Sequence, residues 1–193
     1  SLEAADAMIL SHGHYDHGGG IRRFLELNGH APVYISNYAF GAYYHGPDRY
    51  IGIDPALGGS NRLVKVEDSM VIDEALTLCS CNYKTCHYPV DCAGLQERKE
   101  GVLQPDRFWH EQYLTIQEGG KRIVISGCSH KGILNIVEWL KPDVLIGGFH
   151  FMGQDILGEE NAVLDQAADI LMESDTTYYT CHCTGIKQYA YLK

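Results

Sequence analysis

Three histidines and one aspartate lie within six positions near the start of the chain. His12, His14, Asp16 and His17 occur in "SHGHYDHGGG", residues 11–20, which ends in three glycines. Neutral imidazole and carboxylate groups are ligands for Zn²⁺, Mn²⁺ or Fe²⁺. Residues two apart on an extended segment point the same way, so His12 and His14 could bind one ion together. The glycines let the backbone bend sharply, and Asp16 and His17 could then serve a second ion.

Further histidines stand at the ends of other expected strands. The apolar run 7–11 ends at the first cluster, and His130, His150 and His182 each follow or end a later strand. These later strands are expected within 111–127 (a hairpin), 143–151 and 176–182. Binding sites of open α/β sheets lie outside the carboxyl ends of the strands. The positions therefore predict that these histidines converge on one metal site.

The remaining elements predict an α/β (α+β) fold with a partly parallel sheet. Residues 19–29 should form a helix and 32–36 the next strand, which together with 7–11 make a crossover unit. We expect a short helix and then an irregular, pocket-lining segment over 37–56. The rest should be an antiparallel set at 61–66, 69–73 and 75–81, an aperiodic insertion at about 82–110, and helices at 131–142, 159–174 and 184–193.

Length and charge narrow the class of protein. A chain of 193 residues suits one domain, and we expect a single domain over 1–193. The formal charge of −10 disfavours nucleic acid as a partner, which points to a small-molecule substrate. The sequence contains no apolar run of the roughly 20 residues that cross a bilayer, so no membrane partner is expected. An odd count of seven cysteines favours a reducing cytoplasm over a disulfide framework.

Four cysteines and His87 lie within "CSCNYKTCHYPVDC", residues 79–92. They could form a structural zinc or iron–sulfur site, although the spacing fits neither zinc ribbons nor ferredoxins, and reduced thiols are the commoner state. Cys181 and Cys183 should be packing residues on the face opposite His182 if that strand continues. His30, His45, His87 and His110 are interpreted as ordinary polar residues.

Two short segments stand just before expected helices and could bind an anion there. Lys131 and Thr184 could hold a substrate phosphate or carboxylate beside the metals, or Thr184 could simply cap its helix. Cys128 is a third side chain expected near the substrate.

The chain resembles the metallo-β-lactamase superfamily. "HGHYDH" (12–17) matches its His-x-His-x-Asp-His signature. "ISGCSHKGILNIV" (125–137), "GGFHF" (147–151) and "CHCTG" (181–185) resemble one branch of it, the beta-lactamase superfamily II metal-dependent hydrolases, which includes archaeal dihydropterin–ribofuranosylaminobenzene-phosphate synthase proteins. The resemblance implies an αββα sandwich that binds one or two divalent metal ions, Zn most readily, with Mn or Fe as alternatives.

Carried over to this chain, the resemblance implies two sets of metal ligands. His12, His14 and His130 would bind the first metal, and Asp16, His17 and His182 the second. Many dinuclear members carry a bridging aspartate in a Gly-Asp pair, where this chain has Cys128. Members also begin with several strands ahead of the signature, so we expect an N-terminally incomplete domain that needs the missing segment to complete its fold.

Three functions are compatible with these residues. The first is a metal-dependent hydrolase that uses a metal-activated water on a small ester, phosphodiester or related substrate, with Asp16 as proton acceptor and His150 contacting the substrate or leaving group. The second is a metal-dependent condensation of a pterin pyrophosphate with an aminobenzene-type phosphate. The third is a non-catalytic metal or redox module built on the cysteines.

Overall fold

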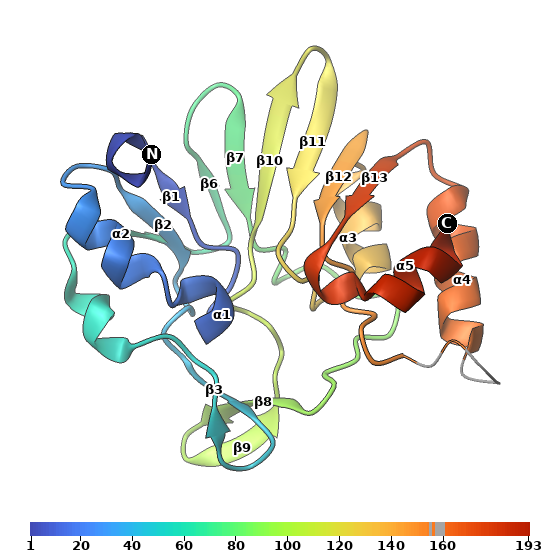
Figure 1. Cartoon of the computed structure of the whole chain (residues 1–193), viewed down its shortest axis with the longest axis horizontal. Helices are drawn as coiled ribbons and strands as arrows, with labels where there is room; N and C mark the ends of the chain where they lie inside the picture. Colours follow the sequence, from blue (N-terminus) through green and yellow to red (C-terminus); the bar gives the residue numbers. More distant parts are fainter. Residues whose placement is uncertain (155, 157–160) are drawn as a thin grey trace. The chain divides into compact units, whose positions relative to one another are not determined.

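The computed structural model describes residues 1–154, 156 and 161–193, and the chain divides into two compact units (Figure 1). Unit 1 comprises Ser1–Met70, Leu78–Asn82 and Cys92–Gln112. Unit 2 comprises Val71–Thr77, Tyr83–Asp91 and Tyr113–Lys193. Within the described residues, no helix has the length and apolar character needed to cross a membrane.

A parallel sheet in unit 1 carries the first histidine cluster. Its strand order is β1-β2-β5, with β1 at Met8–Ile9, β2 at Val33–Ser36 and β5 at Leu63–Val66. Helix α2 (Ile21–Leu27) connects β1 to β2, as the expected crossover unit requires. The prediction that 61–66 joins an antiparallel set was wrong, because β5 pairs in parallel with β2.

A second sheet of unit 1 is antiparallel, with the order β4-β3-β8-β9. The strands are β3 (Ala42–His45), β4 (Arg49–Tyr50), β8 (Leu95–Lys99) and β9 (Val102–Pro105). Two predictions were therefore wrong. Strands β3 and β4 stand where a short helix was expected within 37–56, and β8 and β9 lie in the segment 82–110 that was expected to be aperiodic. The strands have only two to five residues. Buried Glu97, which accepts hydrogen bonds from Gln104 and Arg107, further breaks the apolar alternation of β8.

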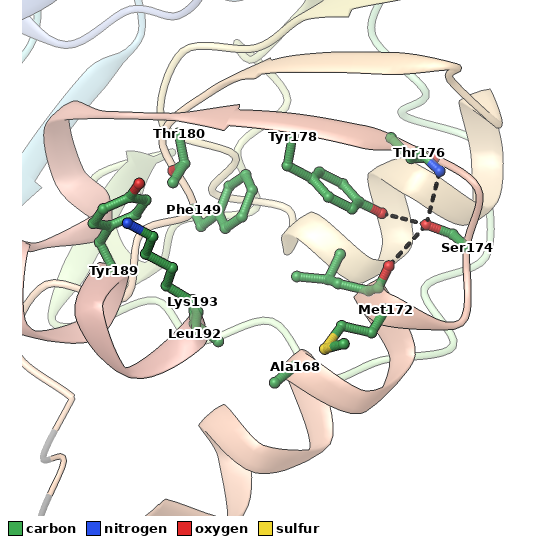
Figure 2. A pocket seen from close by; sticks show the side chains of 11 residues that line it. Phe149, Ala168, Met172, Ser174, Thr176, Tyr178, Thr180, Tyr189, Leu192 and Lys193 are labelled. Atoms are coloured by element: carbon green, nitrogen blue, oxygen red, sulfur yellow. Dashed lines mark hydrogen bonds between the residues drawn. The ribbon is translucent and has the colours of Figure 1, made fainter.

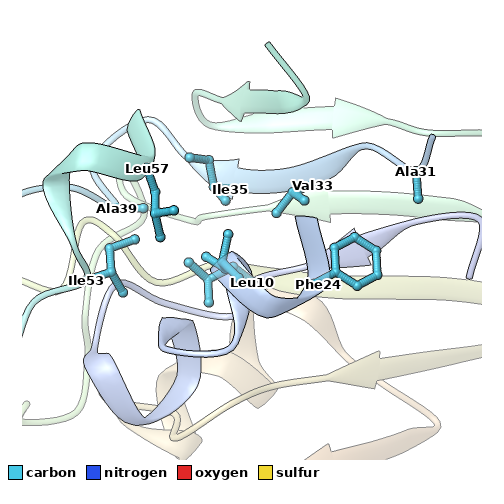
Figure 3. Close-up of a cluster of buried hydrophobic side chains, with 9 residues drawn as sticks. Leu10, Phe24, Ala31, Val33, Ile35, Ala39, Ile53 and Leu57 are labelled. Atoms are coloured by element: carbon cyan, nitrogen blue, oxygen red, sulfur yellow. The ribbon is translucent and has the colours of Figure 1, made fainter. Parts of the chain in front are cut away.

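The core of unit 1 lies against the parallel sheet (Figure 3). It is made of buried apolar side chains from β2, α2, the short helix Pro55–Gly59 and the loops: Leu10, Ile21, Phe24, Ala31, Val33, Ile35, Ala39, Ile53 and Leu57. Burying one large aliphatic side chain contributes about 1.5–3 kcal/mol. Short elements complete the unit, namely η1 (Leu2–Ala4), α1 (Tyr15–Gly18) and η2 (Pro55–Gly59). Leu10 belongs to this core and lies two residues before His12, so core packing fixes where the cluster begins.

The six-stranded sheet has the order β13-β12-β11-β10-β7-β6. Its strands are β6 (Ser69–Val71), β7 (Leu76–Cys79), β10 (Tyr113–Glu118), β11 (Lys121–Ile125), β12 (Val144–Gly147) and β13 (Thr177–Thr180). Strands β10 and β11 form the expected hairpin around two glycines with left-handed φ angles. Strands β11, β12 and β13 are parallel, so the segments after them leave the sheet at one edge.

Three helices and a short turn of helix belong to unit 2. They are α3 (Ile133–Leu140), α4 (Asn161–Met172), η3 (His182–Thr184) and α5 (Ile186–Leu192). The expected helices at 131–142, 159–174 and 184–193 are confirmed by α3, α4 and α5, although Glu159 and Glu160 lie outside the described residues. The last strand is shorter than expected, because β13 ends at Thr180 and the chain turns into η3.

Candidate metal centre

The histidine cluster of unit 1 follows β1 directly and is inside the protein. His12 is 1% exposed and His14 is 5% exposed, and their ring centroids lie 4.7 Å apart. Gly13 between them is required by packing, since a Cβ atom there would collide with the carbonyl oxygen of Ala39. The predicted pairing of His12 with His14 is thus present in the structure, on a backbone that only glycine fits.

Neighbouring polar groups hold these rings in place. The Ser11 hydroxyl lies 3.0 Å from Nδ1 of His12 and 3.4 Å from Nδ1 of His17. The rings of His12 and His17 are 4.0 Å apart. Asp16 is exposed on α1, with its carboxylate 3.6 Å from Nε2 of His17. A hydrogen bond to one imidazole nitrogen leaves the other nitrogen to act as a ligand, which is the usual arrangement around protein-bound metals.

Sequence reasoning missed a second layer of this cluster, made by Asp106 and His110. Nδ1 of buried His110 accepts a 2.9 Å hydrogen bond from the Gly13 amide, and its Nε2 lies 3.1 Å from Asp106. Nε2 of His14 is 3.8 Å from the same carboxylate. His14, Asp106 and His110 have possible ligand atoms within 4.8 Å of one another. The sequence offers only the four-residue spacing of Asp106 and His110, which does not place them beside this cluster.

Burial and hydrogen bonding set the charges of this layer. Burial alone would raise the pKa of the Asp106 carboxyl, but hydrogen bonds from His110 and His14 outweigh it and hold that pKa well below its usual range. Burial lowers the pKa of His110, with Asp106 opposing the shift. The layer therefore pairs an ionised carboxylate with a neutral imidazole whose Nδ1 accepts from Gly13.

Gln112 connects this layer to the end of β1. Its side-chain amide donates a 2.7 Å hydrogen bond to the Leu10 carbonyl, and its backbone amide donates to Ser11 at 2.8 Å. Gln112 is 2% exposed. Buried amide hydrogen bonds of this kind fix the backbone from which His12 projects.

In unit 2, the three segments after β11, β12 and β13 share an unusual backbone feature. Each contains a non-glycine residue with a left-handed φ angle: Ser129 at 59°, His150 at 53° and His182 at 51°. Such residues are uncommon and concentrate at functional sites, because the surrounding structure must hold them there. The predicted positions His150 and His182 are thus marked by backbone geometry as well as by residue type.

The histidines of unit 2 differ in exposure. His130, predicted as a ligand, is 4% exposed, and its ring centroid lies 4.3 Å from that of His150. His182 is exposed within η3. The structure therefore brings His130 and His150 together beside a small pocket. His182 lies on a separate turn, η3.

The two expected substrate contacts, Lys131 and Thr184, are both buried in the structure. Lys131 is 5% exposed, with its ammonium 5.8 Å from the centre of the Tyr113 ring. The Thr184 hydroxyl accepts a 2.9 Å hydrogen bond from the Phe149 amide. The alternative in which Thr184 caps the last helix was wrong, because Gly185 is the N-cap of α5.

The prediction that Cys181 and Cys183 are both packing residues opposite His182 was also wrong. The strand ends at Thr180, so the alternation of faces does not continue. Cys181 is exposed, whereas Cys183 is buried. Cys128, the third expected substrate neighbour, is buried at 4% exposure in the segment after β11.

A small pocket of about 90 Å³ lies beside His130 and His150. Segment 83–91 supplies part of its lining through Pro89 and Asp91. Asn135 on α3 holds this segment, because its side chain accepts from the Tyr88 amide and donates to the Tyr88 carbonyl, both at 2.9 Å. The segment is therefore fixed beside the pocket by a buried amide.

A larger cavity of about 400 Å³ lies elsewhere in unit 2 (Figure 2). Figure 2 shows Tyr178 of β13, Phe149, and Met172 of α4 around it. The Ser174 hydroxyl lies 2.7 Å from that of Tyr178. The lining is mainly apolar and aromatic, so this cavity offers no ligand set for a cation.

Within the described part of the chain, the cysteine-rich segment 79–92 gathers no set of metal ligands. Across the described residues, no three possible ligand atoms that include Cys79, Cys81, Cys86 or Cys92 lie within 4.8 Å of one another. Partial burial raises the pKa of the Cys86 thiol, with Lys131 opposing the shift. Within this part of the structure the zinc or iron–sulfur interpretation has no support.

Comparison with known proteins identifies the family. Residues 3–148 match the family model of the metallo-beta-lactamase superfamily. The chain is 30% identical over 200 residues to the uncharacterized protein MJ0448 of Methanocaldococcus jannaschii, covering 96% of this chain and 71% of that protein. The chain belongs to the metallo-beta-lactamase superfamily, as its residues predicted.

A solved structure supports the same fold. Tm1679, described as a metal-dependent hydrolase of the beta-lactamase superfamily, superposes with a TM-score of 0.78 at 27% identity, covering 94% of this chain and 70% of that one. A more distant relative is the 7,8-dihydropterin-6-methyl-4-(beta-D-ribofuranosyl)-aminobenzene-5'-phosphate synthase of M. jannaschii, 24% identical over 204 residues and covering 96% of this chain and 68% of that protein. The predicted metallo-β-lactamase fold class is confirmed.

The superfamily is metal-dependent, and the residues of this chain fit a metal ion. Unit 1 packs His12, His14 and His17 closely, beside the carboxylates of Asp16 and Asp106. Buried imidazoles in such close contact are typical of metal ligands, which hydrogen bonds from neighbouring groups orient. The donor set of nitrogen and oxygen atoms suits a divalent transition metal ion, without fixing which one.

Proposed function

We propose that this protein is a metal-dependent hydrolase of a small ester, phosphodiester or related substrate. The buried pair His12 and His14, held by Ser11 and by the Gly13–His110 hydrogen bond, is the observation that carries the proposal. Membership of the superfamily supports it, as does the similarity to Tm1679.

The proposal assigns roles to individual side chains. We assign His12, His14 and His130 to one ion, and Asp16, His17 and His182 to a second, with Zn²⁺ preferred and Mn²⁺ or Fe²⁺ as alternatives. A bound divalent cation supplies Lewis-acid polarisation of the reacting oxygen and makes water more acidic. The exposed Asp16 carboxylate accepts the proton that the attacking water loses. His150 contacts the substrate or the leaving group from the edge of the small pocket.

The proposal does not extend to Lys131 or Thr184 as substrate ligands. The Lys131 side chain is buried over Tyr113, and the Thr184 hydroxyl is engaged with the Phe149 amide. The small pocket offers Asp91 and Gln154 as polar lining groups instead. We also propose a cytoplasmic location, based on the odd number of cysteines, and no nucleic-acid partner, based on the charge of −10.

Condensation of a pterin pyrophosphate with an aminobenzene-type phosphate is not favoured. The relative that carries this activity in its name is only 24% identical to the chain. The non-catalytic redox module is not favoured either, because segment 79–92 gathers no ligand set within the described residues.

Chelation and metal return test the proposed function. The purified chain is incubated with generic ester and phosphodiester probes before and after removal of bound metal, and then with Zn²⁺, Mn²⁺ or Fe²⁺ added back. We expect hydrolysis that disappears with the metal and returns with it. Hydrolysis that survives complete metal removal, or adduct formation from the two pterin-pathway substrates without probe hydrolysis, would overturn the proposal.

A further inference from the structure

We propose that Cys128, His182 and Cys183 form a thiolate-containing site for a soft divalent cation in unit 2. The inference deepens the proposed function. It rests on that proposal only in that both use His182 as a metal ligand. It assigns ligand roles to two cysteines, and it changes the kind of metal that the second position prefers.

The first support is proximity within one unit. The sulfur atoms of Cys128 and Cys183 and a ring nitrogen of His182 all lie within 4.8 Å of one another. The three residues come from two elements, since Cys128 follows β11 while His182 and Cys183 lie in η3 after β13. Both sulfur-bearing residues are buried, and the histidine is exposed. The group thus has two sheltered sulfur donors and one donor open to solvent.

The second support is that the neighbouring backbone leaves space for the Cys183 side chain and holds this residue by a hydrogen bond. Gly148 leaves room for the Cys183 sulfur, because a Cβ atom at position 148 would lie 2.5 Å from that sulfur. The Met152 amide donates a 2.9 Å hydrogen bond to the Cys183 carbonyl, which anchors η3 on the segment after β12. His182 is held in the left-handed conformation between these anchored neighbours.

The Cys128 side is fixed in a comparable way. Ser126 and Ser129, which flank it, share a hydrogen bond of 2.8 Å between their hydroxyls. Ser129 has a left-handed φ angle. The Cys183 thiol lies 3.5 Å from the Cys128 carbonyl, the distance of a weak sulfur hydrogen bond. These two contacts hold the turn that carries Cys128 against the Cys183 side chain.

The chemistry of the donors selects the ion. Thiolates are soft ligands that prefer Zn²⁺ and similar ions to Mn²⁺ or Mg²⁺, whereas carboxylates prefer the harder ions. Binding releases one proton from each thiol to solvent and forms two metal–sulfur bonds, so two thiolates neutralise the divalent charge. A sulfur donor at position 128, in place of a carboxylate oxygen, therefore shifts the preference of this site toward Zn²⁺.

Cobalt substitution tests the site with a readout that does not depend on activity. Thiolate bound to Co²⁺ gives an intense near-ultraviolet charge-transfer band, which nitrogen and oxygen ligands do not give. We expect this band when Co²⁺ is added to the metal-free chain, and a loss of about half of it in Cys128→Ser and in Cys183→Ser. The matched control is Cys181→Ser, since Cys181 is exposed in the same segment and joins no such group among the residues that the structure describes. The band of this variant should be unchanged.

One substitution keeps the test informative if a serine variant folds poorly. Cys128→Asp replaces the sulfur donor with a carboxylate, so it should keep the bound-ion count while weakening the band and improving Mn²⁺ binding relative to Zn²⁺. The inference would be overturned if the wild-type chain gave no band, or if neither Cys128→Ser nor Cys183→Ser changed the band. The two thiols would then serve only in buried packing. Metal-dependent hydrolysis without the band leaves the proposed function standing, whereas the band without hydrolysis removes that function and keeps this site.

Discussion

The two units prepare ligands in different ways. In unit 1 the histidine loop has ordinary backbone angles, and hydrogen bonds from Ser11, His110 and Gln112 hold it in place. In unit 2 the equivalent segments after β11, β12 and β13 each place a non-glycine residue in the left-handed region. Orientation thus comes from a hydrogen-bonded second layer in one unit and from constrained backbone in the other.

The two units also differ in the donor atoms that they offer to a metal ion. Unit 1 offers imidazole nitrogens and carboxylate oxygens, while unit 2 adds two buried sulfurs to its histidines. Nitrogen and oxygen donors accept many divalent ions, whereas thiolates are selective. The donors of unit 1 therefore suit a wider range of divalent ions, whereas the group proposed in unit 2 favours Zn²⁺.

The largest expected effect follows from removing a ligand of unit 1. His12→Ala should lower hydrolysis roughly a thousandfold, because Lewis-acid stabilisation is worth several kcal/mol and each 1.4 kcal/mol is tenfold. It should also lower the bound-metal count measured by elemental analysis. His30→Ala is the matched control, since His30 is exposed and lies outside the cluster. Unchanged metal content in His12→Ala would place the essential ligands in unit 2 instead.

A substitution next to the ligands tests whether the loop of unit 1 depends on close packing. Gly13→Ala would push a methyl group into the Ala39 carbonyl, and overpacking of this kind costs about 1–3 kcal/mol. The free energy of unfolding in urea should fall by this amount, with weaker metal binding. Gly29→Ala is the control, because a Cβ atom at position 29 has no neighbour within 4 Å and the residue has no positive φ angle. Equal effects of the two substitutions would contradict the packing explanation.

The sequence was sufficient to predict the parts of the site that are close together along the chain. The elements β1, α2 and β2 around the histidine cluster follow from local spacing, and the structure has each of them within its expected range. The roles of Asp106 and His110 could not be seen, because the hydrogen bond that reveals them joins residues 97 positions apart. Pattern reasoning has no access to such a pairing when only one sequence is known.

Two further misses have local physical causes. The hairpin β8–β9 was hidden because Glu97 is buried and paired, which is rare for an acidic residue and reverses the expected alternation. The turn η3 was read as strand because nothing in "CHC" marks a left-handed histidine, a conformation that only tertiary contacts stabilise. The role of Asn135 beside the pocket likewise could not be predicted from the sequence, because it depends on segment 83–91 lying against α3.

A smaller effect is expected where unit 2 depends on a side-chain amide. Asn135→Ala should cost about 1–3 kcal/mol, because it removes both hydrogen bonds to Tyr88 and one to the Lys131 carbonyl. Hydrogen exchange at the Tyr88 amide should become faster. Glu138→Ala on the same helix is the control: its pair with His87 is between side chains 40% and 62% exposed, and such pairs contribute little. Equal exchange in both variants would mean that segment 83–91 is held by other contacts.

The smallest expected effect concerns pH and is confined to unit 1. Asp54 accepts the Ala56 amide at the start of η2 and is paired with Arg22, and these hydrogen bonds lower its pKa from 3.8. A carboxyl with a lowered pKa in the folded state adds stability above its ordinary pKa, and this is lost as the pH falls through the lowered value. Asp54→Asn keeps a good N-cap without the charge, so its urea midpoint should fall less between pH 7 and pH 3 than that of the unaltered chain. The carboxylate is exposed, so the difference should be slight, and the cobalt band of unit 2 should not change. A loss of that band in Asp54→Asn would show that the metal preference of unit 2 depends on unit 1, and would contradict the division of roles between them.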